Sequence, residues 1–237
     1  MNNVEIFLEK YKQLEEVVRS SYNLKNEDSI SFYLINQDKY KKHKDELKYC
    51  QDVRNLLSHK KKLNNNFAVE PSTQMIEFID NLISSIKNRK KCRDIQIKKK
   101  DVYWETINGN VKAAMHKMNE CTFTHIPILN NDGMVIGVFD ENSIFNYLAN
   151  EEIVEINNEL LFKDIEKYIS LFNREMEEFI FIDPNKYVEE LEHEIEKRFK
   201  EQRRIGMAFV TLNGKSDGNL QGIITPWDII AFNNKTS

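Results

Sequence analysis

The feature that most constrains the fold is an order of elements that occurs twice in the C-terminal part of the chain. Each copy has a short apolar strand, an amphipathic helix, two strands joined by a polar turn and a final helix. The strand and helix segments of the first copy are 102–107, 111–118, 125–129 and 134–139, and those of the second are 179–182, 188–199, 207–212 and 220–224. This order predicts two similar α/β repeats in tandem.

The last strand of the second copy runs directly into a helix. Thr225 suits the N-cap, Pro226 the first helical position, and Asp228 the third. A helix N-terminus carries free N–H groups and partial positive charge, so Thr225 could help to hold a phosphate while Asp228 accepts two ribose hydroxyls. The alternative is a capping box that serves stability alone.

This corner contains a glycine, a hydroxyl residue and an aspartate: Gly222, Thr225 and Asp228. With the repeated order of elements, it resembles a tandem pair of cystathionine beta-synthase (CBS) domains. The resemblance implies two repeats packed sheet to sheet, with clefts that bind an adenine nucleotide (ATP, ADP or AMP) or a related adenosyl ligand as a regulator. Ile223, Thr225 and Asp228 are then the candidate ligand-binding residues.

The first copy departs from the family pattern at its two polar positions. Asp140 stands where the hydroxyl residue belongs, and Ser143 stands where the aspartate belongs. A helix cap survives this exchange, whereas the ribose-binding carboxylate does not. We therefore expect one competent nucleotide cleft, centred on Asp228, and one degenerate cleft.

Composition narrows the class of protein. The chain has 237 residues, 41% of them hydrophobic and 30% charged, which is typical of a soluble globular protein large enough for two domains. No apolar run approaches the length of a membrane span, and no signal peptide is recognisable, so we expect a cytoplasmic protein. The three cysteines have no metal-ligand spacing, and we expect no metal site.

The N-terminal part is predicted to be all helical. Apolar residues with a 3.6-residue period mark helices over 2–21, 39–62 and 71–86, and a short apolar piece covers 29–34. The predicted fold class is α+β: a helical bundle over 1–90, a basic linker over 91–101 and the CBS pair over 102–237. Within the pair, 102–150 is the first repeat, 151–178 a connecting helical segment and 179–237 the second repeat.

The third helix contains Arg54, Asn55 and His59, a spacing that looks like the signature of the HEPN superfamily. His59 could deprotonate a ribose 2′-hydroxyl, Arg54 could stabilise charge on the phosphate, and Asn55 could orient the substrate, without a metal. Residues five apart lie roughly 140° around a helix, so one chain's pair does not converge easily. In HEPN nucleases two protomers complete the site, which implies a homodimer here. The alternative for Arg54 is a structural ion pair with Asp52 or another acid.

Charge is divided between the two halves. Residues 1–100 carry 21 Lys and Arg against 14 Asp and Glu, a net charge of +7, and the remainder carries −11. A basic half suits RNA, although solvated lysine-rich helices would explain it too. The leading hypothesis is a homodimeric, nucleotide-sensing CBS protein with a metal-independent HEPN endoribonuclease domain. The alternatives are a non-enzymatic regulatory or dimerisation module that docks a partner protein, and a bundle that binds RNA without cutting it.

Overall fold

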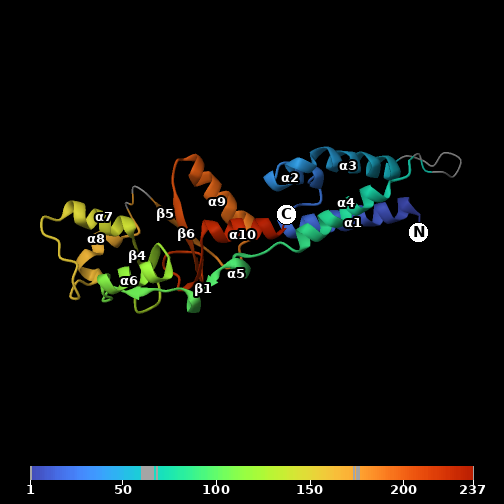
Figure 1. Ribbon diagram of the computed structural model, residues 1–237. Helices are drawn as coiled ribbons and strands as arrows, with labels where there is room; N and C mark the ends of the chain where they lie inside the picture. Colours follow the sequence, from blue (N-terminus) through green and yellow to red (C-terminus); the bar gives the residue numbers. More distant parts are fainter. Residues whose placement is uncertain (1, 60–66, 68, 173, 175–176, 237) are drawn as a thin grey trace. The chain divides into compact units, whose positions relative to one another are not determined.

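The structure is a computed structural model that describes residues 2–59, 67, 69–172, 174 and 177–236. The chain divides into two compact units, Met1–Arg89 and Lys90–Ser237. The first is blue to green in Figure 1, and the second runs from green to red. Together they have the mixed α and β composition that the sequence predicts.

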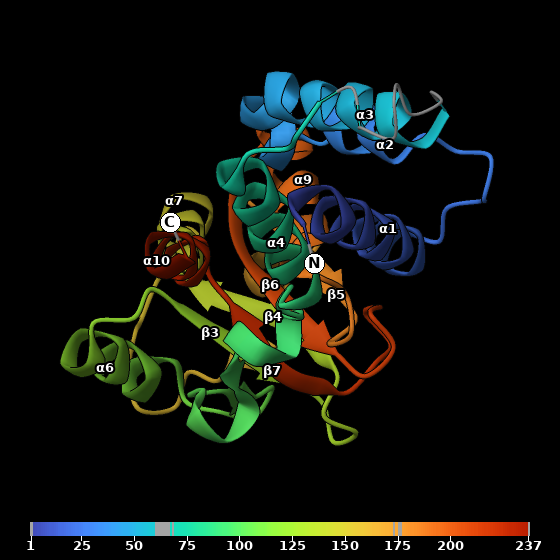
Figure 2. The ribbon, with the colours of Figure 1, turned by 90° about the vertical axis from the view of Figure 1, so that its right-hand side faces the viewer.

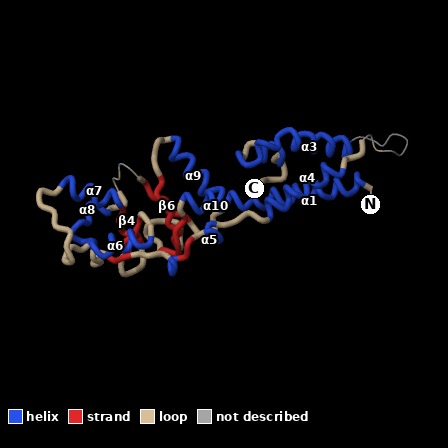
Figure 3. Tube along the Cα trace, viewed as in Figure 1, coloured by secondary structure: helices blue, strands red, loops and turns tan. Residues whose placement is uncertain are grey.

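The N-terminal unit consists of helices in its described part, as the tube in Figure 3 shows. The helices are α1 (Asn3–Tyr22), α2 (Ile30–Ile35), the 3-10 helix η1 (Asp38–His43), α3 (Lys44–His59) and α4 (Thr73–Lys87). Side-chain caps begin three of them, because Asn2, Ser29 and Ser72 each accept a hydrogen bond from a backbone N–H in the first turn. The segment predicted as one helix over 39–62 therefore starts as a 3-10 turn, and its last residues, 60–62, lie outside the described residues.

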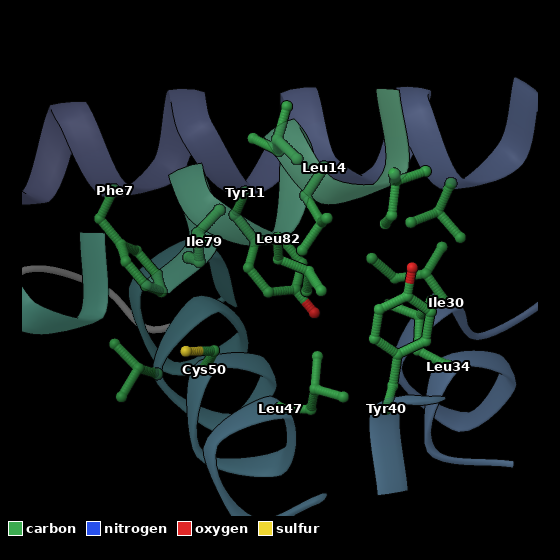
Figure 4. Close-up of a cluster of buried hydrophobic side chains, with 14 of the residues drawn as sticks. Phe7, Tyr11, Leu14, Ile30, Leu34, Tyr40, Leu47, Cys50, Ile79 and Leu82 are labelled. Carbon is green, nitrogen blue, oxygen red and sulfur yellow. The ribbon is translucent and has the colours of Figure 1, made fainter. Parts of the chain in front are cut away.

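The core of this unit is the predicted apolar stripe. Val4, Phe7, Tyr11, Leu14 and Val18 of α1 are buried, and α1 packs along α4. Figure 4 shows α1 side chains pointing toward those of α3 and α4, among them Cys50 and Ile79. These contacts establish a helical bundle, and they do not by themselves distinguish the HEPN superfamily from other small bundles.

The C-terminal unit contains the predicted repeats, with strands and helices in the same order. The first consists of α5 (Cys92–Ile95), β1 (Ile97–Lys98), η2 (Lys99–Asp101), β2 (Glu105–Thr106), α6 (Val111–Cys121), β3 (His125–Leu129), β4 (Val135–Asp140) and α7 (Glu141–Asn150). The second consists of η3 (Phe162–Ile165), α8 (Glu166–Ile169), β5 (Glu178–Ile182), α9 (Val188–Lys200), β6 (Ile205–Thr211), β7 (Leu220–Ile224) and α10 (Pro226–Thr236).

The strands form two sheets of matching design. Each sheet contains one parallel pairing, β2 with β3 and β5 with β6, and the hairpin that follows is antiparallel, β3 with β4 and β6 with β7. Leu129 and Val138 of one sheet share a buried cluster with Phe209 and Leu220 of the other, so the sheets pack against each other. Figure 2 shows these strands lying together.

The boundaries of the repeats differ from those expected. Residues 91–101, predicted as a linker, form α5 and β1; Cys92 is fully buried in the core of the second repeat, and Ile97 pairs with Ile223 of β7. Lysine-rich composition suggested an exposed connection, because composition does not reveal that Cys92 is buried or that the backbone of β1 pairs with β7. In the same way, η3 and α8 fall within 151–178, the predicted connecting segment.

Each repeat lends its leading segment to the other. Lys98 pairs with Gly222 in the second repeat, and Ser170 forms a bridge with Gly137 in the first. A Cβ on Gly222 would clash with the Ile97 carbonyl oxygen, and one on Gly137 would lie 2.7 Å from that of Ile169. Glycine at both positions lets a backbone from the other repeat approach closely. Each of the two corners, after β4 and after β7, thus follows a strand whose glycine contacts the backbone of the other repeat.

Candidate functional site

The corner after β7 has the geometry predicted for it. Thr225 precedes α10, which begins at Pro226. The backbone N–H and the hydroxyl of Thr225 donate to Asp228 Oδ2 at 2.8 and 2.7 Å, and the Asp228 N–H donates to Thr225 Oγ1 at 3.4 Å. The reciprocal capping box of the alternative interpretation is therefore present.

One oxygen of this carboxylate remains available. Asp228 is only partly buried, and within the described ranges no hydrogen bond or ion pair engages its Oδ1. The carboxylate stands in the first turn of α10, at the positive end of the helix dipole. A helix cap and an acceptor for ligand hydroxyls are thus compatible in the same side chain.

The neighbours of Asp228 differ in exposure. Ile223, the third predicted ligand-binding residue, is 9% exposed and joins the cluster between the sheets. Ile223 belongs to β7, the strand that leads to the corner. Trp227, in the first turn of α10, is 77% exposed.

The corner after β4 has the same cap with its polar residues exchanged. Asp140 caps α7, and its Oδ1 accepts from the N–H and the hydroxyl of Ser143, both at 2.7 Å. Its Oδ2 pairs with the guanidinium of Arg174, which also donates to Ser143 Oγ at 3.3 Å. Asp140 is 2% exposed. Both oxygens of this buried carboxylate are therefore occupied from within the protein.

A histidine and a glutamate lie beside this second carboxylate. His125, the first residue of β3, is the register partner of Asp140, and its Nε2 lies 2.6 Å from Oε2 of Glu177. Ligand atoms of His125, Asp140 and Glu177 all lie within 4.8 Å of one another. No local pattern in the sequence indicates this cluster, because strand pairing brings His125 to Asp140 and Glu177 comes from the segment before β5, in the other repeat.

In the N-terminal unit, Arg54 and Asn55 are neighbours within a polar cluster. Arg54 donates to Asn55 Oδ1 and to Glu15 Oε1, each at 3.1 Å, and its guanidinium lies over the Tyr11 ring, 5.8 Å from the centroid. Burial raises the pKa of Tyr11 above its usual value. The acid partner that the alternative interpretation requires for Arg54 is thus present, and it is Glu15.

His59 is the last residue of α3 as the structure defines it. Its side chain lies outside the described residues, as do Lys60, Lys61 and Lys62. The structure brings Arg54 and Asn55 together, and the relation of either to the His59 imidazole stays a prediction.

The cysteines differ in reactivity. Burial raises the pKa of the Cys92 thiol to about 12 and that of Cys50 to about 11. Both are packing residues at neutral pH, whereas Cys121 is exposed.

Comparison with known proteins identifies part of the C-terminal unit. The CBS domain family model matches residues 92–150, and the match begins inside the predicted linker. Comparison with curated protein sequences gives no match. The helical arrangement over 1–90 is not assigned to a family by these comparisons.

Several solved structures are similar to the chain. CbpB in complex with c-di-AMP is 16% identical, with a TM-score of 0.49, covering 67% of this chain and 93% of that one. CBSX2 in complex with AMP is 12% identical (TM-score 0.45; 62% and 98% covered), and a hemolysin-like protein containing a CBS domain from Oenococcus oeni PSU is 17% identical (TM-score 0.42; 61% and 90% covered). The ligands are those of the proteins named.

Among the described helices, none combines the length and the apolar character that a bilayer span needs.

Proposed function

We propose that this protein is a cytoplasmic regulatory module whose C-terminal unit binds one adenine nucleotide (ATP, ADP or AMP), or a related adenosyl ligand, per chain. The observation that carries the proposal is the contrast between the two corners. Asp228 keeps one carboxylate oxygen available at a helix N-terminus, whereas both oxygens of Asp140 are occupied. The CBS domain over 92–150 supports the class of ligand.

In the proposed complex, Asp228 accepts hydrogen bonds from the ribose hydroxyls through Oδ1. The Thr225 hydroxyl and the N-terminal N–H groups of α10 favour the phosphate. Ile223 supplies an apolar wall at the corner, and the first corner stays empty. The regulatory step is a change in the packing of the two repeats, which requires different ligand affinities for the two arrangements.

Calorimetry of the full-length chain with ATP, ADP, AMP and S-adenosylmethionine tests this proposal. We expect one site per chain for at least one of these ligands, weakened about tenfold or more by Asp228→Ala, which corresponds to about 1.4 kcal/mol. Asp132→Ala, on the exposed turn between β3 and β4, is the matched control and should bind as the wild type does. Two equivalent sites, or binding unaffected by Asp228→Ala, would contradict the proposal.

A second function is proposed for the N-terminal unit: metal-independent RNA cleavage by a HEPN-like homodimer. The observation in its favour is the direct hydrogen bond between Arg54 and Asn55 on the helix that ends at His59. In this hypothesis His59 is the general base, Arg54 stabilises the phosphate, and the partner chain completes the site. The Glu15–Arg54 pair is the observation against it, because it gives Arg54 a structural role.

The test is cleavage of a mixed RNA pool in EDTA by the wild type, by His59→Ala and by Glu15→Gln, with and without ATP or AMP. Cleavage that His59→Ala abolishes and Glu15→Gln preserves supports the nuclease and makes the nucleotide lanes a test of control. No cleavage by a folded dimer leaves the alternative, a non-enzymatic module that docks a partner protein. RNA retained on filters with a steep salt dependence, but not cut, indicates an RNA-binding bundle.

A further inference from the structure

The cluster of His125, Asp140 and Glu177 lies at the first corner, which binds no nucleotide in the proposed function, yet it gathers three metal-binding side chains at one point. Asp140 ends β4 and His125 begins β3, opposite each other in the sheet of the first repeat. Glu177 directly precedes β5, the first strand of the second repeat. Their side chains are largely buried, with exposed fractions of 17% for His125, 2% for Asp140 and 18% for Glu177.

We propose that these three side chains bind one divalent transition-metal ion, of the Zn²⁺ or Co²⁺ class. Imidazole nitrogen together with carboxylate oxygens is a ligand set that such ions accept. The ion would take the place of the proton in the hydrogen bond between His125 Nε2 and Glu177 Oε2. The metal-bound imidazole keeps one proton, on Nδ1, and any second proton goes to solvent.

The distances require only small movements. Ligand atoms bound at about 2.0–2.2 Å in a tetrahedral site stand roughly 3.3 Å apart. The three donor atoms already lie within 4.8 Å of one another, and the 2.6 Å separation of His125 Nε2 and Glu177 Oε2 would lengthen by less than about 1 Å. Rotation of the partly exposed Glu177 side chain is enough for this change.

Groups that orient the ligands are already in place. His125 Nδ1 lies 2.7 Å from Thr124 Oγ1, which can accept a hydrogen bond from Nδ1–H once Nε2 binds an ion. Asp140 is held by the N–H and hydroxyl of Ser143. Metal ligands in proteins are usually supported in this way, and the residual exposure of His125 and Glu177 leaves an open side for a fourth ligand.

Arg174 is the competing cation. Its guanidinium pairs with Asp140 Oδ2, and a carboxylate oxygen has a second lone pair with which to bind a metal. The Arg174 guanidinium and the divalent ion are both positively charged and would lie beside the same carboxylate, that of Asp140. Their repulsion should weaken metal binding. Removing Arg174 therefore distinguishes a metal site, which would bind more tightly, from an ion-pair cluster, which would only lose stability.

Titration of the untagged, full-length, chelator-treated chain with Co²⁺, followed by visible absorption and calorimetry, tests the site. We expect one Co²⁺ per chain, displaced by Zn²⁺, with binding weakened at least tenfold in His125→Gln and in Glu177→Gln. Arg174→Met should bind several-fold more tightly than the wild type. His116→Gln, at an exposed histidine on α6, is the matched control and should leave binding unchanged.

Zn²⁺ should also raise the unfolding temperature of the wild type and not that of Glu177→Gln, because an ion bound only by the native state stabilises it. A wild type that binds no Co²⁺ or Zn²⁺, or binding that His125→Gln leaves unchanged, overturns the proposal. Asp228→Ala, which tests the nucleotide site, should bind the metal normally.

Discussion

The corners after β4 and β7 share one backbone design and differ in where the carboxylate stands. Asp140 occupies the N-cap of α7, whereas Asp228 lies three residues after Thr225, within the first turn of α10. Both acids form a reciprocal cap with a hydroxyl residue. The N-cap carboxylate is drawn inward and neutralised by Arg174, while the carboxylate in the helix stays at the surface with an oxygen available.

Both corners have the same helix cap, so the cap does not decide whether the carboxylate can bind a ligand. The burial of the carboxylate and the presence of a neighbouring cation decide it. A buried carboxylate requires a counter-charge because its desolvation is costly. Arg174, supplied by the segment before β5, meets that requirement in the first repeat. A partly exposed carboxylate has no such requirement and stays available to a ligand.

The largest expected effect comes from removing the counter-charge at the first corner. Arg174→Met leaves Asp140 buried and unpaired, which should lower the free energy of unfolding by about 3 kcal/mol. Urea unfolding followed by tryptophan fluorescence measures this, since Trp104 and Trp227, the only tryptophans, both lie in the C-terminal unit. Arg203→Met is the control, because its ion pair with Glu178 is half exposed and should contribute less than about 1 kcal/mol. An equal loss of unfolding free energy in Arg174→Met and Arg203→Met would contradict the idea that burial makes the Arg174 pair the more important one.

An intermediate effect is expected where the leading segments cross. Gly222→Ala places a Cβ against the Ile97 carbonyl and should lower the free energy of unfolding by about 2 kcal/mol through strain at the pairing of β1 with β7. Gly137→Ala meets the Ile169 carbonyl at a longer distance and should cost less. The same urea experiment compares them, and a neutral Gly222→Ala would show that β1 does not pair closely with β7.

The smallest effects are expected from the hydroxyl groups. Ser143→Ala removes a hydroxyl that donates to the buried Asp140 carboxylate and should cost about 1–2 kcal/mol. Thr225→Ala removes a partly buried cap and should cost about 1 kcal/mol, which Thr225→Ser should restore. If Thr225→Ala proved the more destabilising of the two, the second corner would be the structural one and the proposed assignment of roles would be reversed.

A predicted effect of pH comes from the cysteines of the two units. Because burial raises the pKa of Cys92 to about 12 and of Cys50 to about 11, their thiols stay protonated in the native state across neutral pH. Alkylation at pH 8, read by mass spectrometry, should therefore modify Cys121 in the folded chain and all three cysteines after unfolding. Rapid native modification of Cys92 would contradict the burial of α5 against the second repeat.

Much of the fold could be predicted from periodicity. The stripe from Val4 to Val18, the strand from His125 to Leu129 and the cap at Thr225 lie where the sequence predicts them, since local spacing and cap chemistry determine them. The exchange of the polar residues at Asp140 and Ser143 could be predicted too, because an N-cap and the residue three positions later lie in one short segment of sequence. The Arg54–Asn55–His59 motif remains a prediction, since its partner groups are not set by local sequence.

The sequence by itself determined the elements, their repetition and the corner at Asp228, because these depend on residues within a few positions of one another. Only the tertiary structure decided that residues 91–101 complete the sheet of the other repeat, that Glu15 pairs with Arg54, and that Arg174, His125 and Glu177 gather around Asp140. The pairs Glu15–Arg54, Asp140–Arg174 and His125–Glu177 join residues 39, 34 and 52 positions apart, and His125 meets Asp140 only through the register of β3 with β4. They arise from sheet register and from the need to neutralise buried charge, which no local pattern encodes.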